Sequence, residues 1–438
     1  MNKFFKIFQY ELLHFARSPF KIITLMIFFL AMIYGCQNGL ELYKKQMKEI
    51  DSIKEKNKES IDNMMLQYDS IENGTQEKPR RDPTIPYWAL WNTPSYAFKI
   101  PSQMMVFNIG QSEQYGYYKR VTNWSSTFDS DLAEEIANPE RLALGTLDFN
   151  FVFIYLCPIL IIVLLFNVGG MEKDLKIDNL IYLQRISKSK WLMTRFLFYL
   201  VLVTSSVFIL VLYYGIFSEA IKNESDSFNN LLLHIILYIL LWFLPFFIIN
   251  YYGKDSSDNA MKMISMWLAF CIVIPGSVHQ ISSVRYPTNY MTDYLDVSRV
   301  KSNEIFDLSI DTLKINLLKE FPLLRETKYA SDTTLNNSII NRSVSGLVNL
   351  LNKDVALKIE KANEEKNIFI KKFNIINPIT FFQNKLNSFS RTDYYAYYLY
   401  RLRIQAIIDK KIRLILNDTW NKVIVNKQRY IEYIENLR

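Results

Sequence analysis

Long unbroken runs of apolar residues alternate along the chain with polar, Lys/Asn-rich and Tyr-rich segments. A helix needs about 20 apolar residues to cross the hydrocarbon core of a bilayer. The segments that meet or approach this length are residues 21–41, 149–168, 191–217, 231–252 and 260–278. The last of these is short and weakly apolar. The pattern predicts a mainly α, polytopic α-helical membrane protein with five transmembrane helices.

Residues 1–20 precede the first span and mix aromatic and aliphatic residues with basic ones. This pattern predicts an amphipathic helix lying in the membrane interface. The alternative is a plain basic segment in front of the span. A cleaved signal peptide is disfavoured, because the apolar run starts late and no small-x-small site follows it closely.

Basic residues decide the expected orientation. They crowd the N-terminus and the loop 169–190, whereas the short loop 218–230 holds three acids and only Lys222. The positive-inside rule therefore places the N-terminus, the loop 169–190 and the turn 253–259 in the cytoplasm. The same rule leaves residues 42–148, 218–230 and 279–438 on the far side.

The two large segments, 42–148 and 279–438, are too long to be structureless linkers. Residues 44–60 read as a charged helix and residues 80–101, rich in Pro and aromatic residues, as an ordered loop. A further helix is expected from Thr392 to about residue 433, capped by Thr392 or Asp393 and broken at Asn417-Asp418. Five spans leave residue 438 outside, so the number of spans is odd or a sixth follows.

Composition and motifs give no sign of catalysis. The chain has no GxxxxGK[ST], GxGxxG, HExxH or GxSxG motif, and its three Cys and three His are scattered. We therefore expect no catalytic, cofactor-binding or metal-binding residues. The net charge of +8 fits cytoplasmic loops beside anionic headgroups better than a nucleic-acid partner.

Charged side chains are nearly missing from the predicted spans. Buried acids or arginines mark the pathways of ion-coupled pumps, so such a pump is disfavoured. His234 lies in an apolar helix, where packing is the favoured interpretation and a proton relay the other. Energy for any transport is then expected from another subunit.

The loop 169–190 carries the most informative sequence. It runs Glu172-Lys173-Asp174-Leu175-Lys176, then Asn179 to Leu183, then Ile186-Ser187-Lys188 into the third span. It resembles the cytoplasmic loop of type-2 ABC exporter permeases, in which an acidic-basic start is followed by Gly-Thr-Leu, an apolar stretch, Pro-Val-Ser and a basic residue. Lys176 stands where that family usually has Gly, and Arg185 where it has Pro.

The resemblance implies that this loop forms the coupling helix that docks on an ATPase. Physically, a short amphipathic helix can lie in a groove of a partner, and an ordinary interfacial loop is the alternative. The expected coupling residues are Glu172, Lys173, Leu180, Ile181, Leu183, Ile186 and Lys188. Lys188, Lys190 and Arg195 are expected at the level of the lipid headgroups.

Weaker motifs elsewhere narrow the resemblance to a subgroup of these permeases with two enlarged extracytoplasmic segments, related to permeases implicated in the maturation of multicopper enzymes. In that subgroup a sixth span follows the tail. The motifs are Arg81-Asp82-Pro83, Gly110-Gln111-Ser112, Asn138-Pro139 with Gly145, Asp148-Phe149, the stretch 251–287, Asn377-Pro378 and Arg391-Thr392-Asp393-Tyr394.

The expected function is that of a non-catalytic permease subunit in the bacterial inner membrane, working with a separate ABC ATPase subunit to drive export or mechanical work. Further expected partners are a second permease copy or a related permease, the lipid bilayer and an extracytoplasmic protein. The alternative is a membrane-anchored scaffold of an envelope complex. A membrane-embedded enzyme is disfavoured, because no cluster of acids, His or Ser lies in the spans.

Overall fold

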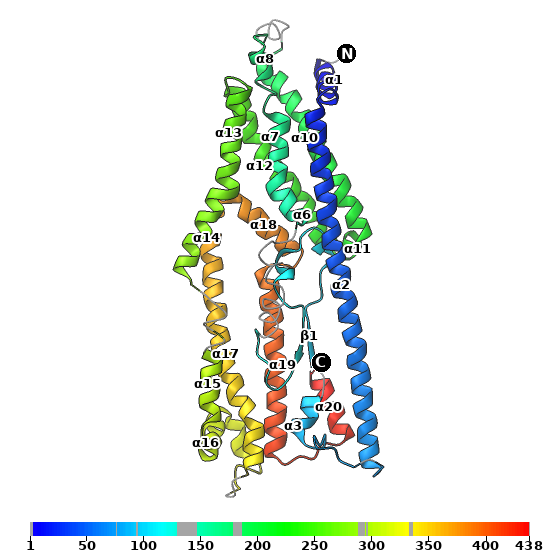
Figure 1. Ribbon diagram of the computed structural model, residues 1–438, viewed down its shortest axis with the longest axis vertical. Helices are drawn as coiled ribbons and strands as arrows, with labels where there is room; N and C mark the ends of the chain where they lie inside the picture. The colour runs from blue at the N-terminus through cyan, green and yellow to red at the C-terminus, as the bar shows by residue number, and fades with distance from the viewer. Residues whose placement is uncertain are drawn as a thin grey trace.

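A computed structural model describes residues 3–75, 77–92, 95–128, 147–177, 186–287, 294, 297–332 and 336–437. One half, here called the bundle, holds the apolar helices, and the other, the distal half, holds the polar ones (Figure 1). The bundle contains α1 (Lys3–Ala16), the start of α2 (Pro19–Glu72), α6 (Phe149–Phe151), η3 (Val152–Leu156), α7 (Cys157–Leu165), α8 (Met171–Asp174), α10 (Lys188–Phe217), α11 (Ala220–Asn223), α12 (Ser225–Tyr252), α13 (Ser256–Leu268), η4 (Ala269–Val273) and α14 (Ile274–Arg285).

The distal half is mainly helical as well, with one small sheet. It contains the rest of α2, α3 (Pro86–Asn92), β1 (Ser95–Phe98), η1 (Gln103–Val106), η2 (Gly110–Glu113), β2 (Tyr118–Val121), α15 (Val297–Phe306), α16 (Ile310–Glu320), η6 (Pro322–Glu326), α17 (Asn337–Lys371), α19 (Tyr394–Trp420) and α20 (Lys427–Leu437). Between the halves, α18 (Pro378–Phe389) packs against α12, η3 and η4 of the bundle. Strands β1 and β2 pair antiparallel, with Ser95 opposite Val121.

Four helices are long and apolar enough to cross a membrane: the first part of α2, α10, α12 and the continuous rod α13–η4–α14. The fold is therefore that of an α-helical membrane protein. The rod spans Ser256–Arg285, so the segment that looked weakest in the sequence is a full-length helix. The apolar helix Phe149–Leu165 is shorter than the other four, although its sequence is the most uniformly apolar.

Helix α2 has 54 residues, which corresponds to about 80 Å at a rise of 1.5 Å per residue. It includes both the first predicted span and the charged helix expected over 44–60, and it links the two halves (Figure 1). Gly35 and Gly39 lie where other backbone segments touch it. A Cβ at Gly35 would lie 2.5 Å from the amide nitrogen of Phe149, and one at Gly39 would lie 2.6 Å from the carbonyl oxygen of Met105.

The π-helical turn η3 is explained by the proline that follows it. Pro158 has no N–H to donate to the carbonyl of Ile154, four residues earlier. In the structure the hydroxyl of Tyr238 donates to that carbonyl, and the indole N–H of Trp267 donates to the carbonyl of Tyr155 at 3.1 Å. Side chains of α12 and α13 thus replace helix bonds that cannot be left open in an apolar bundle.

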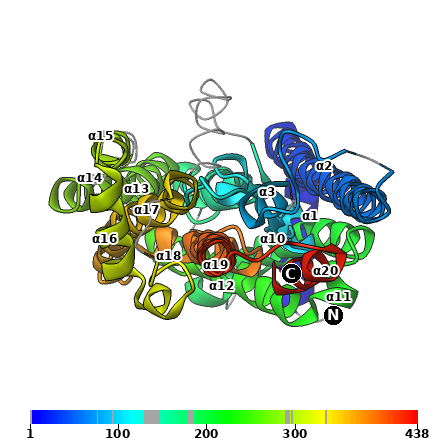
Figure 2. The same ribbon diagram turned by 90° about the horizontal axis from the view of Figure 1, so that it is seen from below.

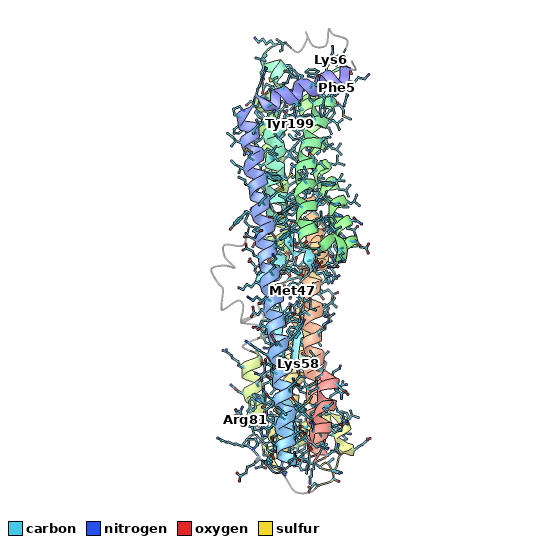
Figure 3. All side chains as sticks on the ribbon, turned by 90° about the vertical axis from the view of Figure 1, so that its right-hand side faces the viewer. Phe5, Lys6, Met47, Lys58, Arg81 and Tyr199 are labelled. Atoms are coloured by element: carbon cyan, nitrogen blue, oxygen red, sulfur yellow. The ribbon has the colours of Figure 1, made fainter. Side chains whose placement is uncertain are left out.

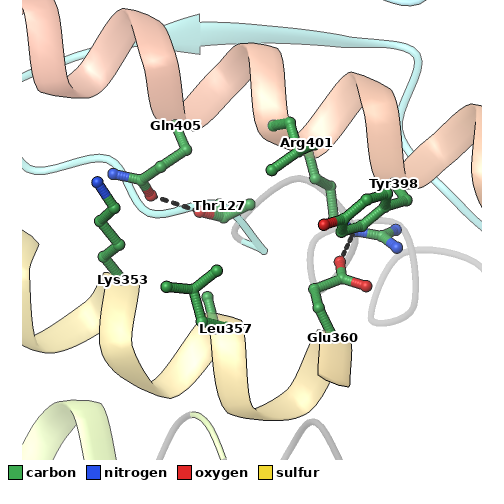
Figure 4. A pocket seen from close by; sticks show the side chains of 9 residues that line it. Thr127, Lys353, Leu357, Glu360, Tyr398, Arg401 and Gln405 are labelled. Atoms are coloured by element: carbon green, nitrogen blue, oxygen red, sulfur yellow. Dashed lines mark hydrogen bonds and ion pairs between the residues drawn. The ribbon is translucent and has the colours of Figure 1, made fainter. Parts of the chain in front are cut away.

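In the distal half, the paired helices α17 and α19 form the centre of the packing, with α16 and the small sheet against them. The view in Figure 2 places α2 on one side and α13–α17 on the other, with α19 between them. A buried ion pair links the two central helices: Nε of Arg401 lies 2.5 Å from Oε1 of Glu360 (Figure 4). The hydroxyl of Tyr394 donates to the other carboxylate oxygen of Glu360.

Two expectations for the distal half need correction. Residues 80–101 are not only loop, since they contain α3 and β1. The helix that begins after its cap Asp393 runs through Asn417-Asp418, and the break comes after Trp420, so the part expected near residue 433 belongs to the separate helix α20. Asp418 does not stop it because its buried carboxylate accepts hydrogen bonds from Arg429 and Tyr433 of α20. It fastens α20 to α19.

Cys36, Cys157 and Cys271 are buried and free. Nδ1 of His234 lies 2.8 Å from the carbonyl oxygen of Asn230, and its ring packs against Phe389 of α18, 4.8 Å between centroids. These contacts support packing as the role of His234.

Lys411 gives a pH-dependence to test. Its ammonium group is buried, where it donates to the carbonyl of Val121 at 2.9 Å, and burial lowers its pKa to about 7 from 10.5. Between these two values the unfolded chain binds more protons than the folded one, so the free energy of unfolding should rise with pH. We expect the opening free energy of α19, measured by hydrogen exchange in detergent, to rise from pH 7 to about pH 9.

Substitution Lys411→Met should remove this contribution and flatten the pH profile of α19. Its neighbour Lys410 is exposed, so Lys410→Met is the matched control and should keep the wild-type slope. Equal slopes in both variants would contradict the assignment to Lys411.

Candidate functional site

Helix α8, in the loop between α7 and α10, lies at the end of the bundle farthest from the distal half, as does α1 (Figure 1). Of the predicted coupling residues, Glu172 and Lys173 lie on α8, Ile186 precedes the Ser187 cap of α10, and Lys188 begins that helix. Leu180, Ile181 and Leu183 lie outside the described residues. The structure therefore locates both ends of the loop.

Glu172 joins the loop to α10 and α1 through one arginine. Arg195 of α10 places Nη1 2.5 Å from Oε1 of Glu172, and its Nε lies 2.5 Å from Oε2 of Glu11 on α1. The same Nη1 donates to the carbonyl of Val168 at 2.7 Å. The side chains of Arg195 and Glu11 are both 0% exposed, so one guanidinium ties three chain segments together away from water.

A lysine and a tyrosine extend this cluster to α2. The hydroxyl of Tyr199 donates to Oε1 of Glu11 at 2.7 Å, and Nζ of Lys21 donates to that hydroxyl oxygen at 2.9 Å. Nζ of Lys21 also reaches Asn167 and the carbonyl of Leu164. Figure 3 shows Tyr199 just beneath α1, which lies across the end of the bundle.

We call Glu11, Lys21, Glu172, Arg195 and Tyr199 the ionic cluster. Two acids face two bases, so the cluster is formally neutral, which lowers the cost of burying each charge. Arg195 pairs directly with both carboxylates, and Lys21 reaches Glu11 through the hydroxyl of Tyr199. Such a cluster positions helices, and proton transfer is not needed to explain it.

The ionic cluster joins Lys21 and Arg195, which lie within predicted spans, to Glu11 and Glu172, which lie outside them, and all four side chains are buried. The partners are far apart in sequence, so spacing could not reveal them. One signal was present: Glu11 follows Ile7 by four residues on α1, and both are buried, so the acid lies on the apolar face of the amphipathic helix.

A second set of contacts joins the loop to the turn between α12 and α13. Lys173 donates to the carbonyl of Gly253, and Lys188 donates to the carbonyl of Tyr251. Asp174 accepts from both the amide and the hydroxyl of Ser256. The first and last described parts of the loop are therefore both fastened to the 251–256 region.

Buried amide side chains and two glycines add to the contacts between this loop and the α12–α13 turn. Oδ1 of Asn250 accepts from the amide of Gly169 at 2.9 Å and from Nδ2 of Asn259 at 3.3 Å. A Cβ at Gly169 would lie 2.6 Å from the carbonyl oxygen of Asn250, and one at Gly170 would lie 2.4 Å from the amide nitrogen of Ser256. Only glycine permits this approach.

Lys176 ends α8 in a left-handed conformation, with φ of 58°. Its amide donates to the carbonyl of Lys173, and the amide of Ile177 donates to that of Glu172. These two bonds form a Schellman motif, whose left-handed position is usually glycine. The residue that departs from the permease pattern thus adopts the backbone geometry that glycine would favour.

Comparison with known proteins gives no identification: neither a protein family, nor a curated protein, nor a solved structure matches the chain. Within the described part of the chain, no group of three His, Cys, Asp or Glu side chains could hold a metal ion. What the geometry offers at this end is a loop linked by polar contacts to α1, α2, α10 and the α12–α13 turn.

Arg195 allows a direct test of the ionic cluster. Substitution Arg195→Ala leaves Glu11 and Glu172 buried without their cation, which should cost about 3–5 kcal/mol of stability. We expect a clear fall in the thermal denaturation midpoint of the full chain in detergent. The exposed Arg17→Ala on the same side of the molecule serves as the control and should change little.

A substitution at Lys176 should increase stability, by less than Arg195→Ala decreases it. A left-handed non-glycine residue carries a strain of about 1–2 kcal/mol, so Lys176→Gly should stabilise the loop and slow hydrogen exchange of the Ile177 amide. Lys176→Ala keeps the strain and should leave exchange unchanged. Faster exchange of the Ile177 amide in Lys176→Gly would contradict the claim that Lys176 is strained.

Proposed function

We propose that the chain is the permease subunit of an ABC transporter in the bacterial inner membrane, coupling ATP hydrolysis by a separate subunit to export or mechanical work. The observation that carries the proposal is the anchoring of the loop 169–190. A loop that resembles an ATPase-coupling segment is joined by buried polar contacts to α10 and to the α12–α13 turn. Force applied to such a loop would reach several helices at once.

The left-handed Lys176 supports the register of the resemblance. It occupies the position at which the family usually has glycine and takes the conformation that glycine adopts most easily. Arg185, the other departure, lies outside the described residues. The subgroup with two enlarged extracytoplasmic segments remains part of the proposal.

In the proposed orientation the loop 169–190 and the N-terminus face the cytoplasm, and the distal half lies outside it. The apolar helix Phe149–Leu165 then serves as the fifth span beside the four longer ones. Helix α2 supports a mechanical role, because one unbroken helix runs from the ionic cluster into the distal half. A second permease copy would complete the transporter.

The proposal is tested by co-expressing the full chain with its neighbouring genes and with candidate ABC ATPase subunits, then measuring co-purification and ATPase activity in detergent. Wild type should retain the ATPase. The double substitution Leu183→Asp with Ile186→Asp should detach or uncouple it, because two carboxylates replace the apolar anchors of the coupling helix.

The matched control is Leu323→Asp with Ile424→Asp, which places the same charges on exposed residues of the distal half. This variant should bind and stimulate the ATPase normally. Failure of the wild-type chain to bind the ATPase would overturn the permease function. Full activity with a catalytically dead ATPase would favour the membrane-anchored scaffold instead.

A further inference from the structure

A cavity of about 850 Å³ lies between α2 and α19, where the bundle meets the distal half. Tyr43 and Met47 of α2 form one wall, and the segment 99–103 and the start of α12 at Glu224 complete it. Figure 3 places Met47 about midway along the molecule, well away from α1 and the ionic cluster. The cavity is thus separate from the candidate coupling loop.

The facing wall is one row of α19 and its preceding turn. Arg391, Tyr395, Leu399 and Arg403 follow one another at four-residue spacing and all line the cavity, which places them on one side of the helix. Among the described residues, neither guanidinium forms an ion pair with a carboxylate. Two exposed arginines therefore face the cavity with their charge available.

The acids of the cavity are occupied by structural bonds. Both carboxylate oxygens of Glu224 lie within 2.9 Å of the Ser102 hydroxyl, and one also accepts from the amide of Gln103. Asp393 caps α19 through the amide of Ala396. Among the described residues neither acid forms an ion pair with Arg391 or Arg403, so both guanidinium groups stay available beside the two carboxylates.

Lys99 adds a third cation to the cavity wall. Its ammonium lies 4.2 Å from the centre of the Tyr397 ring. An adjoining cavity of about 420 Å³, which shares Asp393 and Tyr395 with the first, contributes Lys371 and Lys385. Basic groups therefore outnumber acids around the whole region.

Exposed apolar side chains line the cavity, and others lie beside α2 at the end of α10. Ile100 and Leu399 are 61% and 57% exposed, and Phe217, at the end of α10, is also 57% exposed. Phe217 lies beside α2, with Nζ of Lys44 5.1 Å from its ring centre. It continues the exposed apolar residues Ile209, Leu212, Tyr213 and Ile216 of α10, which face lipid if α10 spans the membrane.

We propose that this cavity binds the anionic headgroup of an amphiphile whose acyl chains lie along the apolar surface of α10 and α2. Arginine pairs with phosphate or carboxylate oxygens through two parallel hydrogen bonds, and the exposed apolar side chains supply area for the acyl chains. A soluble anion would use the arginines but would leave these apolar side chains bare. The inference goes beyond the proposed function, since it holds whether or not an ATPase docks at the other end.

The test measures binding of short-chain phosphatidylglycerol to the full chain in a neutral detergent by native mass spectrometry and calorimetry. We expect saturable binding that phosphatidylcholine of the same chain length does not match. Substitution Arg391→Gln with Arg403→Gln should weaken it at least ten-fold. Arg391→Lys with Arg403→Lys keeps the charge and should retain most of the affinity, which separates a charge effect from misfolding.

The control is Arg413→Gln, which removes an exposed arginine farther along the same helix and should leave binding unchanged. Equal affinity for both lipids, or an unchanged affinity in the double Gln variant, would overturn the proposal. Inorganic phosphate binding as tightly as the lipid would overturn it too, because the ligand would then be a soluble anion.

Discussion

The bundle depends on the burial of Arg195 between Glu11 and Glu172. A guanidinium in an apolar, water-poor environment is costly unless carboxylates neutralise it, and here Glu11 and Glu172 accept from its Nε and Nη1. Because these carboxylates come from α1 and from the loop after α7, the charge requirement fixes the positions of both relative to α10. Lys21 and Tyr199 extend the constraint to the first turn of α2. Apolar packing alone would let these helices slide, since Leu and Ile contacts have little directionality.

Helix α2 carries that constraint along the molecule. Its first turn is held by the ionic cluster, and at Gly35 and Gly39 it touches backbone of the segments that begin α6 and form η1. Beyond these contacts the same helix packs against α20 in the distal half. No proline interrupts α2 after its first residue, so the helix has no proline kink. A displacement of one end of α2 should therefore move the other end as well.

Apolar periodicity predicted the helical class, the apolar segments and the helix after Asp393, because these features depend on local composition and capping. The helix through Asn417-Asp418 was not predictable, since the acid is fixed by Arg429 and Tyr433 of α20. The sequence likewise could not bring Glu11, Glu172 and Arg195 together, because their pairing is tertiary. It did locate the loop, and it named Glu172, whose carboxylate lies 2.5 Å from Nη1 of Arg195.

Charged groups are used differently at the two ends of the bundle. In the ionic cluster each carboxylate is paired with a cation, and the pairs are buried away from water. Their attraction therefore holds the helices in position and is not available to a ligand. Around the cavity beside α19, Glu224 and Asp393 are held by backbone and hydroxyl donors, while Arg391 and Arg403 stay exposed. The three cations of this cavity, Lys99, Arg391 and Arg403, outnumber its two acids, so the surplus positive charge attracts an external anion. The ionic cluster thus positions helices, whereas the cavity beside α19 presents charged groups that a ligand can bind.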